Sequence, residues 1–157
     1  MNPATASLPA RRLASSAGAA RPLRERLAAT PRLACEILSR AINEGDLEAA
    51  IACFAPGAAL VDPDGSAAQG TEAIRARLSG LVSVAARVEI ALAGVLVASD
   101  IALAHERWDI SYGNQRSHPP RGASPTLVLR LIGGEWRIAI ACPWGQPASP
   151  PLEAVWP

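Results

Sequence analysis

The stretch AINEGDLEAAIACFAPG, residues 41–57, decides the fold because it contains the end of one helix and the whole of the next. Gly45 ends the first helical pattern, and Asp46 is a residue type that caps the start of a helix. The apolar residues of the second helix have helical spacing and comprise Leu47, Ala50, Ile51 and Phe54. Pro56 and Gly57 then stop it, so the sequence predicts two consecutive helices joined by a tight turn.

The residues on either side extend this pattern. Thr30 is suited to cap the first helix and Pro31 to occupy its first position, so that helix is predicted from Thr30 to the glycine turn. Residues 58–62, with the sequence AALVD, predict a short strand that ends at a turn around Pro63. A third helix is predicted after Gly70, and its apolar residues are Ile74, Leu78 and Leu81.

The second half of the chain has the pattern of β-structure. Four strands are predicted, at residues 84–98, 101–112, 124–132 and 135–142. Gly133 and Gly134 separate the last two as a two-residue hairpin turn. Helices followed by a meander of long antiparallel strands predict an α+β fold, in which a curved sheet wraps around the N-terminal helices and encloses a cavity.

The domain organisation follows from length and composition. A chain of 157 residues predicts one domain, which we place at residues 30–146. Residues 1–29 are rich in Ala, Ser, Pro and Arg and predict a disordered tail, although an organelle transit peptide has a similar composition. Residues 147–157 are rich in proline and predict a second tail over the surface.

Charge and hydropathy exclude several classes of partner. The formal net charge is only +1, and the arginine-rich N-terminal segment is balanced by a mildly acidic remainder, so nucleic-acid binding is not predicted. Charged residues interrupt every apolar run before it reaches the roughly 20 residues that span a bilayer, so no membrane segment is predicted. No set of His, Asp and Glu has a metal-ligand spacing, and neither a metal nor another cofactor is expected.

The cysteines bear on the cellular compartment. Cys35, Cys53 and Cys142 are odd in number, form no CxxC motif and have apolar neighbours. This pattern favours buried reduced thiols over a disulfide framework. It predicts a cytoplasmic location.

Several motifs together resemble a known family. In residues 41–78, NEGD joins two helices and a DP turn precedes GTEAIR, which is similar to the opening of the SnoaL-like and ketosteroid-isomerase-like proteins of the nuclear transport factor two superfamily. ASDIALAHERWDI (98–110) and TLVLRLIGGEWRIAIACPWG (126–145) resemble the later strands of that superfamily. The resemblance implies a cone-shaped α+β domain, usually dimeric, with a small and often hydrophobic ligand in its mouth. Members include isomerases, polyketide cyclases, epoxide hydrolases and non-catalytic binding proteins.

Asp62 is the first candidate site residue. It matches the position of the general base in ketosteroid isomerases, which use a carboxylate in an apolar pocket to move a proton beside a carbonyl group. The positions of that family's two oxyanion donors correspond to Leu38 and Leu127, which cannot donate hydrogen bonds, so steroid isomerisation by that mechanism is not expected. The structural alternative is that Asp62 starts the turn before Pro63.

The run HERWD, residues 105–109, supplies the other candidates. In a strand, His105, Arg107 and Asp109 share one face, whereas Glu106 and Trp108 share the other. The run resembles the E-R-x-D strand of limonene epoxide hydrolases, where Arg and Asp lie on the pocket wall, although that family's second Asp is replaced here by isoleucine. If the three residues face inward they would approach Asp62; otherwise Arg107 and Asp109 form an exposed ion pair.

These observations lead to one predicted function and one alternative. The sequence predicts a pocket protein that binds a small apolar ligand and forms a homodimer through the outer face of its sheet. The candidate ligand-binding residues are Phe54, Trp108, Leu127 and Trp144, and the candidate catalytic residues are Asp62, His105, Arg107 and Asp109. The alternative is a cofactor-independent isomerase, cyclase or epoxide-hydrolase-like enzyme that uses a pocket carboxylate as base. Whether the protein is an enzyme is left open by its sequence.

Overall fold

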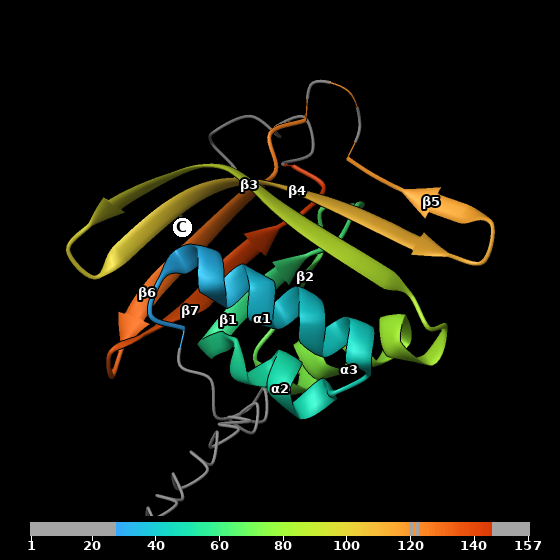
Figure 1. Cartoon of the computed structure of the whole chain (residues 1–157), viewed down its shortest axis with the longest axis horizontal. Coiled ribbons are helices and arrows are strands. Elements are labelled where there is room, and N and C mark those ends of the chain that lie inside the picture. Colours follow the sequence, from blue (N-terminus) through green and yellow to red (C-terminus); the bar gives the residue numbers. More distant parts are fainter. Residues whose placement is uncertain (1–27, 120, 122, 146–157) are drawn as a thin grey trace, which may run out of the picture.

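Three helices lie against one face of a curved sheet (Figure 1). The computed structural model describes residues 28–119, 121 and 123–145. The helices are α1 (Pro31–Glu44), α2 (Leu47–Ala52) and α3 (Thr71–Ser83). The strands are β1 (Phe54–Val61), β2 (Ala67–Gln69), β3 (Arg87–Ala98), β4 (Ile101–Tyr112), β5 (Gln115–Ser117), β6 (Thr126–Ile132) and β7 (Glu135–Cys142).

The predicted tails lie almost wholly outside the described residues. The exceptions are Ala28 and Ala29 at the end of the N-terminal segment. Ala28 is buried, and its carbonyl accepts a hydrogen bond of 2.8 Å from the Trp136 amide of β7. The chain is therefore attached to the sheet two residues before the predicted start of the domain, and the division into one domain and two tails stays a prediction.

The sheet contains seven strands in the order β2-β1-β7-β6-β4-β3, and β5 pairs with the C-terminal end of β4. All neighbouring strands are antiparallel except β1 and β7, which run parallel. The curved sheet with helices on one side confirms the predicted α+β cone (Figure 1). The topology differs in that the sheet is mixed, because β1 follows the helices and pairs in parallel with the last strand of the meander.

The predicted helix signals have the expected geometry. The Thr30 hydroxyl accepts a hydrogen bond of 3.1 Å from the Leu33 amide, at the start of α1. Gly45 ends that helix in the left-handed region, with φ 73°, where a side chain would be strained. The Asp46 carboxylate accepts a hydrogen bond of 3.0 Å from the Ala49 amide and so caps α2.

The boundaries of several elements differ from the prediction. Phe54 was expected in the second helix but begins β1, because the Cys53 carbonyl accepts a hydrogen bond from the Ile138 amide of β7. Helix α3 continues to Ser83, so β3 begins at Arg87 and not at residue 84. The three-residue strands β2 and β5 were not predicted, since a strand of that length has no recognisable alternation.

The core lies between α1 and the concave face of the sheet. Its fully buried side chains include Leu38 and Ile42 from α1 and Leu127, Leu129 and Ile138 from the sheet. Each such side chain contributes roughly 1.5–3 kcal/mol by leaving water. The Asn43 amide group also bridges the Val88 backbone of β3, accepting at 2.7 Å and donating at 2.9 Å. These bonds fix the register of α1 over β3.

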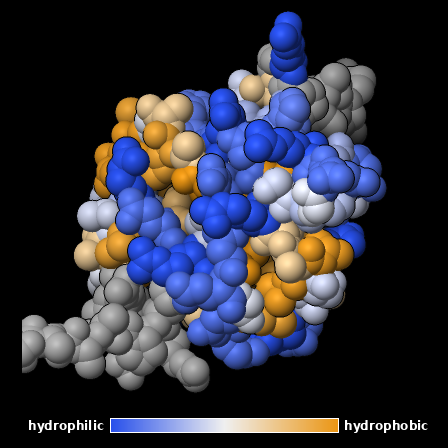
Figure 2. Space-filling view, turned by 45° about the vertical axis from the view of Figure 1, so that its right-hand side comes forward, coloured by the Kyte–Doolittle hydropathy of each residue, from blue (hydrophilic) through white to orange (hydrophobic). Residues whose placement is uncertain are grey.

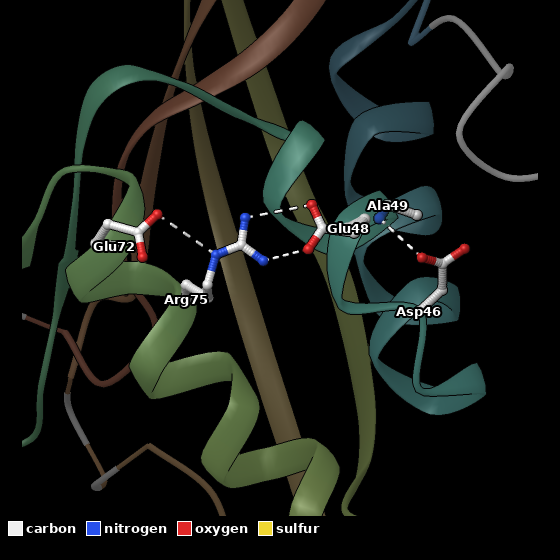
Figure 3. A network of polar contacts seen from close by, with 5 residues as sticks. All are labelled: Asp46, Glu48, Ala49, Glu72 and Arg75. Carbon is white, nitrogen blue, oxygen red and sulfur yellow. Dashed lines mark hydrogen bonds and ion pairs between the residues drawn. The ribbon is translucent and has the colours of Figure 1, made fainter.

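Charged residues join the two shorter helices. Arg75 of α3 pairs with Glu48 of α2 (Figure 3). The Arg75 Nε also lies 3.6 Å from Oε1 of Glu72, one turn earlier in α3. The same end of α2 carries the Asp46 cap (Figure 3). The pairs lie at the surface, so they orient α3 beside α2 more than they stabilise the fold.

The surface is mixed in character. On the face shown in Figure 2, hydrophobic residues gather in two clusters with hydrophilic surface between them. All three cysteines are buried and free, as the sequence predicted. None of the helices in the described residues has the length and apolar composition needed to cross a membrane.

Candidate functional site

A cavity of about 280 Å³ lies where the end of β1, helix α3, strand β4 and the segment after β7 meet. Its apolar lining includes Leu60, Leu81, Trp108, Ile110, Pro143 and Trp144. The fold brings these residues together from four parts of the chain. Trp108 and Ile110 are alternate residues of β4 and therefore present their side chains to the same inner face.

Asp62 lies at the rim of this apolar cavity, immediately after β1. Its Oδ2 lies 2.8 Å from Arg77 Nη2 of α3, and the aspartate side chain is 22% exposed. The Asp62 amide donates to the Ser66 carbonyl at 2.8 Å, and its carbonyl accepts from the Gly65 amide at 2.9 Å. Asp62 therefore forms part of the turn around Pro63 and also places a carboxylate beside the cavity.

The two faces of β4 differ completely in burial. Glu106 and Trp108 are 4% and 1% exposed and face the interior. His105 and Arg107 face outward, and Asp109 on the same face is partly exposed. Arg107 donates to Asp109 Oδ2 from Nε at 3.0 Å and from Nη2 at 2.8 Å.

The inward arrangement considered for His105, Arg107 and Asp109 is therefore wrong. Both faces of the strand contain large apolar residues, so the sequence did not show which face is buried. The helices cover the face of Glu106 and Trp108. Arg107 and Asp109 line a separate cavity of about 410 Å³, together with Glu106, His118 and Pro125. Asp62 borders the apolar cavity instead, so the structure does not unite the four candidate catalytic residues.

The candidate ligand-binding residues also separate into two groups. Trp108 and Trp144 line the apolar cavity, together with Asp62. Phe54 and Leu127 are 6% and 0% exposed and belong to the hydrophobic core. Because both side chains pack in the core, no ligand is needed to explain why these positions are apolar.

Glu106 is a site residue that sequence reasoning passed over. Both carboxylate oxygens are buried, and the Trp108 indole is the hydrogen-bonding side chain that acts on them. Burial raises the pKa of this carboxyl from 4.5 to about 7, and a hydrogen bond with the Trp108 indole opposes part of that rise. The indole Nε1 is likewise buried, two residues further along the same strand. The sequence did contain one signal of this burial: the alternation of side chains along the strand places Glu106 on the same face as Trp108.

Two thiols lie near this carboxyl. Burial raises the pKa of Cys35 on α1 and of Cys142 at the end of β7, and the negative charge of Glu106 raises both further. Both thiols are therefore neutral at physiological pH. In the described part of the chain, no group of three or more His, Cys, Asp and Glu residues could hold a metal ion.

The sequence matches one family model. The model of the SnoaL-like domain matches residues 17–137, which is more than half of the chain. No curated protein matches the sequence significantly.

Solved structures share the fold at low sequence identity. A ketosteroid isomerase-like protein from Erwinia carotovora atroseptica is 18% identical, with a TM-score of 0.56, over 71% of this chain and 89% of that one. An NTF-2 like protein of unknown function from Shewanella oneidensis is 17% identical, with a TM-score of 0.56, over 66% and 86% of the two chains. An NTF2-like protein with a cystatin-like fold from Novosphingobium aromaticivorans is 17% identical, with a TM-score of 0.57, over 69% and 75%. These likenesses establish the fold alone.

Proposed function

Because this chain belongs to the SnoaL-like domain family, we propose that its apolar cavity binds a small, mostly apolar molecule. The observation that carries the proposal is the character of the cavity wall. Two indoles, Trp108 and Trp144, and several aliphatic side chains line about 280 Å³, while Asp62 and Arg77 are its charged lining residues. Ligand sites commonly have this composition, in which apolar walls supply affinity and a few polar groups supply orientation.

The size of the cavity limits the ligand. Small-molecule sites usually measure roughly 300–1,000 Å³, so this cavity is at the small end. Each square ångström of apolar surface removed from water contributes about 25 cal/mol, and a flat aromatic or alicyclic molecule would bury apolar surface against the cavity wall. The ligand class is therefore a compact hydrocarbon framework with few polar groups.

The alternative function is enzymatic. Asp62 lines the cavity and its carboxylate lies 2.8 Å from Arg77, and a carboxylate positioned in this way suits a base for proton transfer or water activation. An isomerase, cyclase or epoxide-hydrolase-like activity would use this residue. His105, Arg107 and Asp109 take no part in either proposal, because they lie on the outer face.

We also propose a homodimer through the outer face of the sheet. Leu96, Ile101 and Leu103 are between 39% and 69% exposed at one end of the β3–β4 hairpin. With Val128 of β6 they line a shallow hollow, and we call these four residues the outer apolar patch. A second copy that covers the patch would remove it from water. Free buried thiols fit a reducing compartment, and we propose a cytoplasmic location.

Titration with 2-ethylnaphthalene, monitored by tryptophan fluorescence, tests the binding proposal. We expect saturable binding that weakens by about tenfold in Trp144→Ala, because the indole forms one wall of the cavity. Leu131→Ala on the exposed end of β6 is the matched control and should bind as the unaltered protein does. Equal loss of binding in both variants, or no saturable binding at all, would contradict the proposed site.

A further inference from the structure

A further cavity lies at the open end of the β3–β4 hairpin, where β5 pairs with β4. It measures about 520 Å³, and it adjoins the cavity of about 410 Å³ described above, with which it shares Arg107, Asp109 and His118. Unlike the apolar cavity, it is lined mostly by charged and polar side chains, including three arginines and two carboxylates. A ligand of this cavity must therefore supply groups that bind charged side chains.

Three of the polar lining residues form a row across neighbouring strands. Arg87 of β3 is directly opposite Ser111 of β4, which is in turn directly opposite Arg116 of β5. Strand β4 lies between the other two strands at this end of the sheet (Figure 1), and paired residues of antiparallel strands present their side chains to the same face. Since neighbouring strands are about 4.8 Å apart, the two arginine backbones are about 10 Å apart, with the serine between them. Both guanidinium groups can therefore reach a group bound above Ser111.

The hydrogen-bond donors of this row are available. The Arg116 guanidinium and the Ser111 hydroxyl have no side-chain partner in the described part of the chain. Arg87 contacts Glu89 through Nε, at 3.4 Å, and its side chain is 70% exposed. The two Nη groups of Arg87 form no hydrogen bond with the residues that the structure describes. The row therefore offers donors from two guanidinium groups and one hydroxyl to a single acceptor.

The carboxylates of the cavity are compensated by other arginine atoms. Glu89 of β3 is directly opposite Asp109 of β4, and like charges at such positions repel each other. Asp109 accepts hydrogen bonds of 3.0 and 2.8 Å from Arg107, and Glu89 contacts Nε of Arg87. Each carboxylate therefore has an arginine two residues away on its own strand. Arg116 is the third arginine, and its positive charge has no counterpart among the described lining residues.

We propose that this cavity binds a small phosphate monoester, whose phosphate group lies above Ser111 between Arg87 and Arg116. The planar donor fork of a guanidinium group matches two oxygens of a phosphate. One such fork already occupies both oxygens of a carboxylate, whereas a phosphate has three terminal oxygens and a charge of about −2 near neutral pH. A phosphate therefore uses donors on both sides of β4 and supplies the negative charge that Arg116 lacks.

The rest of the cavity limits the organic part of the ligand. Its volume of about 520 Å³ lies within the usual range of small-molecule sites, so it holds more than a phosphate group alone. Glu89 and Asp109 lie beside the row, and ionised carboxylates only accept hydrogen bonds. Hydroxyl groups of the ligand would donate to them, whereas an apolar substituent would not. The ligand class is therefore a short hydroxylated phosphate monoester, of which glycerol 3-phosphate is a simple example.

The phosphate site is separate from the two surfaces proposed above. It shares Ile110 with the apolar cavity but neither of that cavity's charged residues, Asp62 and Arg77. The outer apolar patch lies at the other end of the hairpin, and nine residues of β3, or about 30 Å, separate Leu96 from Arg87. Covering the patch therefore does not require covering the phosphate site.

Calorimetric titration of the full chain with glycerol 3-phosphate tests the proposal. We expect saturable binding of one molecule per chain, with a change in the phosphorus-31 resonance of the ligand. Glycerol lacks the phosphate and should show no saturable binding. Glycerate has a carboxylate in place of the phosphate and should bind about tenfold more weakly, because it uses fewer of the donors. The affinity for glycerol 3-phosphate should decrease as the salt concentration rises.

Three variants and one control assign the binding to the row. Arg116→Ala should weaken the affinity for glycerol 3-phosphate by about 30-fold, and Ser111→Ala by about threefold. Arg87→Lys keeps the charge but loses the donor fork, so it should weaken binding by about fivefold. Arg130→Ala removes an exposed positive charge from β6, outside the cavity, and should bind as the unaltered protein does. Urea denaturation should be unchanged in all four, since these side chains are not part of the core.

The outcomes decide between a built site and general attraction to positive charge. Equal weakening in Arg116→Ala and Arg130→Ala would overturn the site, because net charge alone would then explain the binding. Equal affinities for glycerol 3-phosphate and glycerate would overturn the selection of a phosphate. No saturable binding of glycerol 3-phosphate would overturn the proposal as a whole. Arg116→Ala should still bind 2-ethylnaphthalene, so the phosphate site and the apolar pocket succeed or fail independently.

Discussion

Glu106 and Arg107 are consecutive residues of β4, and their environments are opposite. Glu106 is 4% exposed, whereas the Arg107 side chain is 69% exposed and pairs with Asp109 at 2.8 Å. The outer pair lies in solvent, where an ion pair contributes about 0–1 kcal/mol. The inner carboxyl is removed from solvent, where the charged form is strongly disfavoured. The comparison teaches that burial, and not the number of charged neighbours, decides which residues of this strand have unusual chemistry.

Removing the inner indole should produce the largest effect. Trp108 is 1% exposed, and Trp108→Ala would leave a large cavity between β4 and the helices. We expect the free energy of unfolding to fall by about 3–5 kcal/mol, as measured by urea denaturation. Tyr112→Ala, at the exposed end of the same strand, serves as control and should cost far less. A small loss in Trp108→Ala would mean that the inner face is not packed as described.

The second prediction concerns pH. Glu106 has a folded-state pKa of about 7, above its usual 4.5, so the folded protein binds more protons than the unfolded chain between these values. The free energy of unfolding should therefore decrease as pH rises from about 4.5 to about 7, by roughly 3 kcal/mol in total, and then level off. Glu106→Gln should remove this slope. An unchanged slope in that variant, in denaturation curves taken across the range, would assign the effect to other groups.

The third prediction applies to the outer apolar patch. In Leu103→Glu a charge would lie in the middle of the proposed dimer interface, where it would be buried without a partner. We expect the dissociation constant of the dimer to rise roughly 100-fold, with a monomeric mass by light scattering at micromolar concentration. Leu131→Glu lies outside the patch and should leave the mass unchanged. If the unaltered protein is already monomeric at this concentration, the proposed dimer is incorrect.

The smallest effect is expected for the outer ion pair. Arg107→Leu removes an exposed guanidinium and leaves Asp109 in contact with water, so the free energy of unfolding should change by less than about 1 kcal/mol. Asp109→Asn should behave in the same way. A loss of several kcal/mol in either variant would show that this pair is buried in solution, and would restore an interior position for these residues.

The sequence predicted most of the helical half of the fold, because its signals are local. A cap at Thr30, a glycine at position 45 and a cap at Asp46 each act within a few residues and need no tertiary information. Phe54 was misplaced because its spacing from Ile51 continues the helical stripe, and only the long-range pairing of β1 with β7 draws it into a strand. Boundaries set by distant contacts cannot be obtained from a local pattern.

The candidate site was predicted less completely. Asp62, Trp108 and Trp144 were recognised and do lie around one cavity. Alternation divided residues 105–109 correctly into two faces but could not show which face is inner. Ile101 and Leu103 are as apolar as any inner residue, yet they face outward, while the small Ala102 and Ala104 fit beneath the helices. Because the sequence did not show that the face of Glu106 is the inner one, it could not predict that this carboxyl is buried.

The parallel pairing of β1 with β7 has a consequence for how the chain folds. β1 ends at Val61, and the strand beside it is completed only at Cys142, so the two are separated by most of the domain. Contacts between distant parts of a chain slow folding, because the intervening loop must close before any stabilising contact is made. During synthesis, β1 has no neighbour except the short β2 until the last strand has left the ribosome. We therefore expect the sheet to assemble after translation, in a slow final step that joins the first strand to the last.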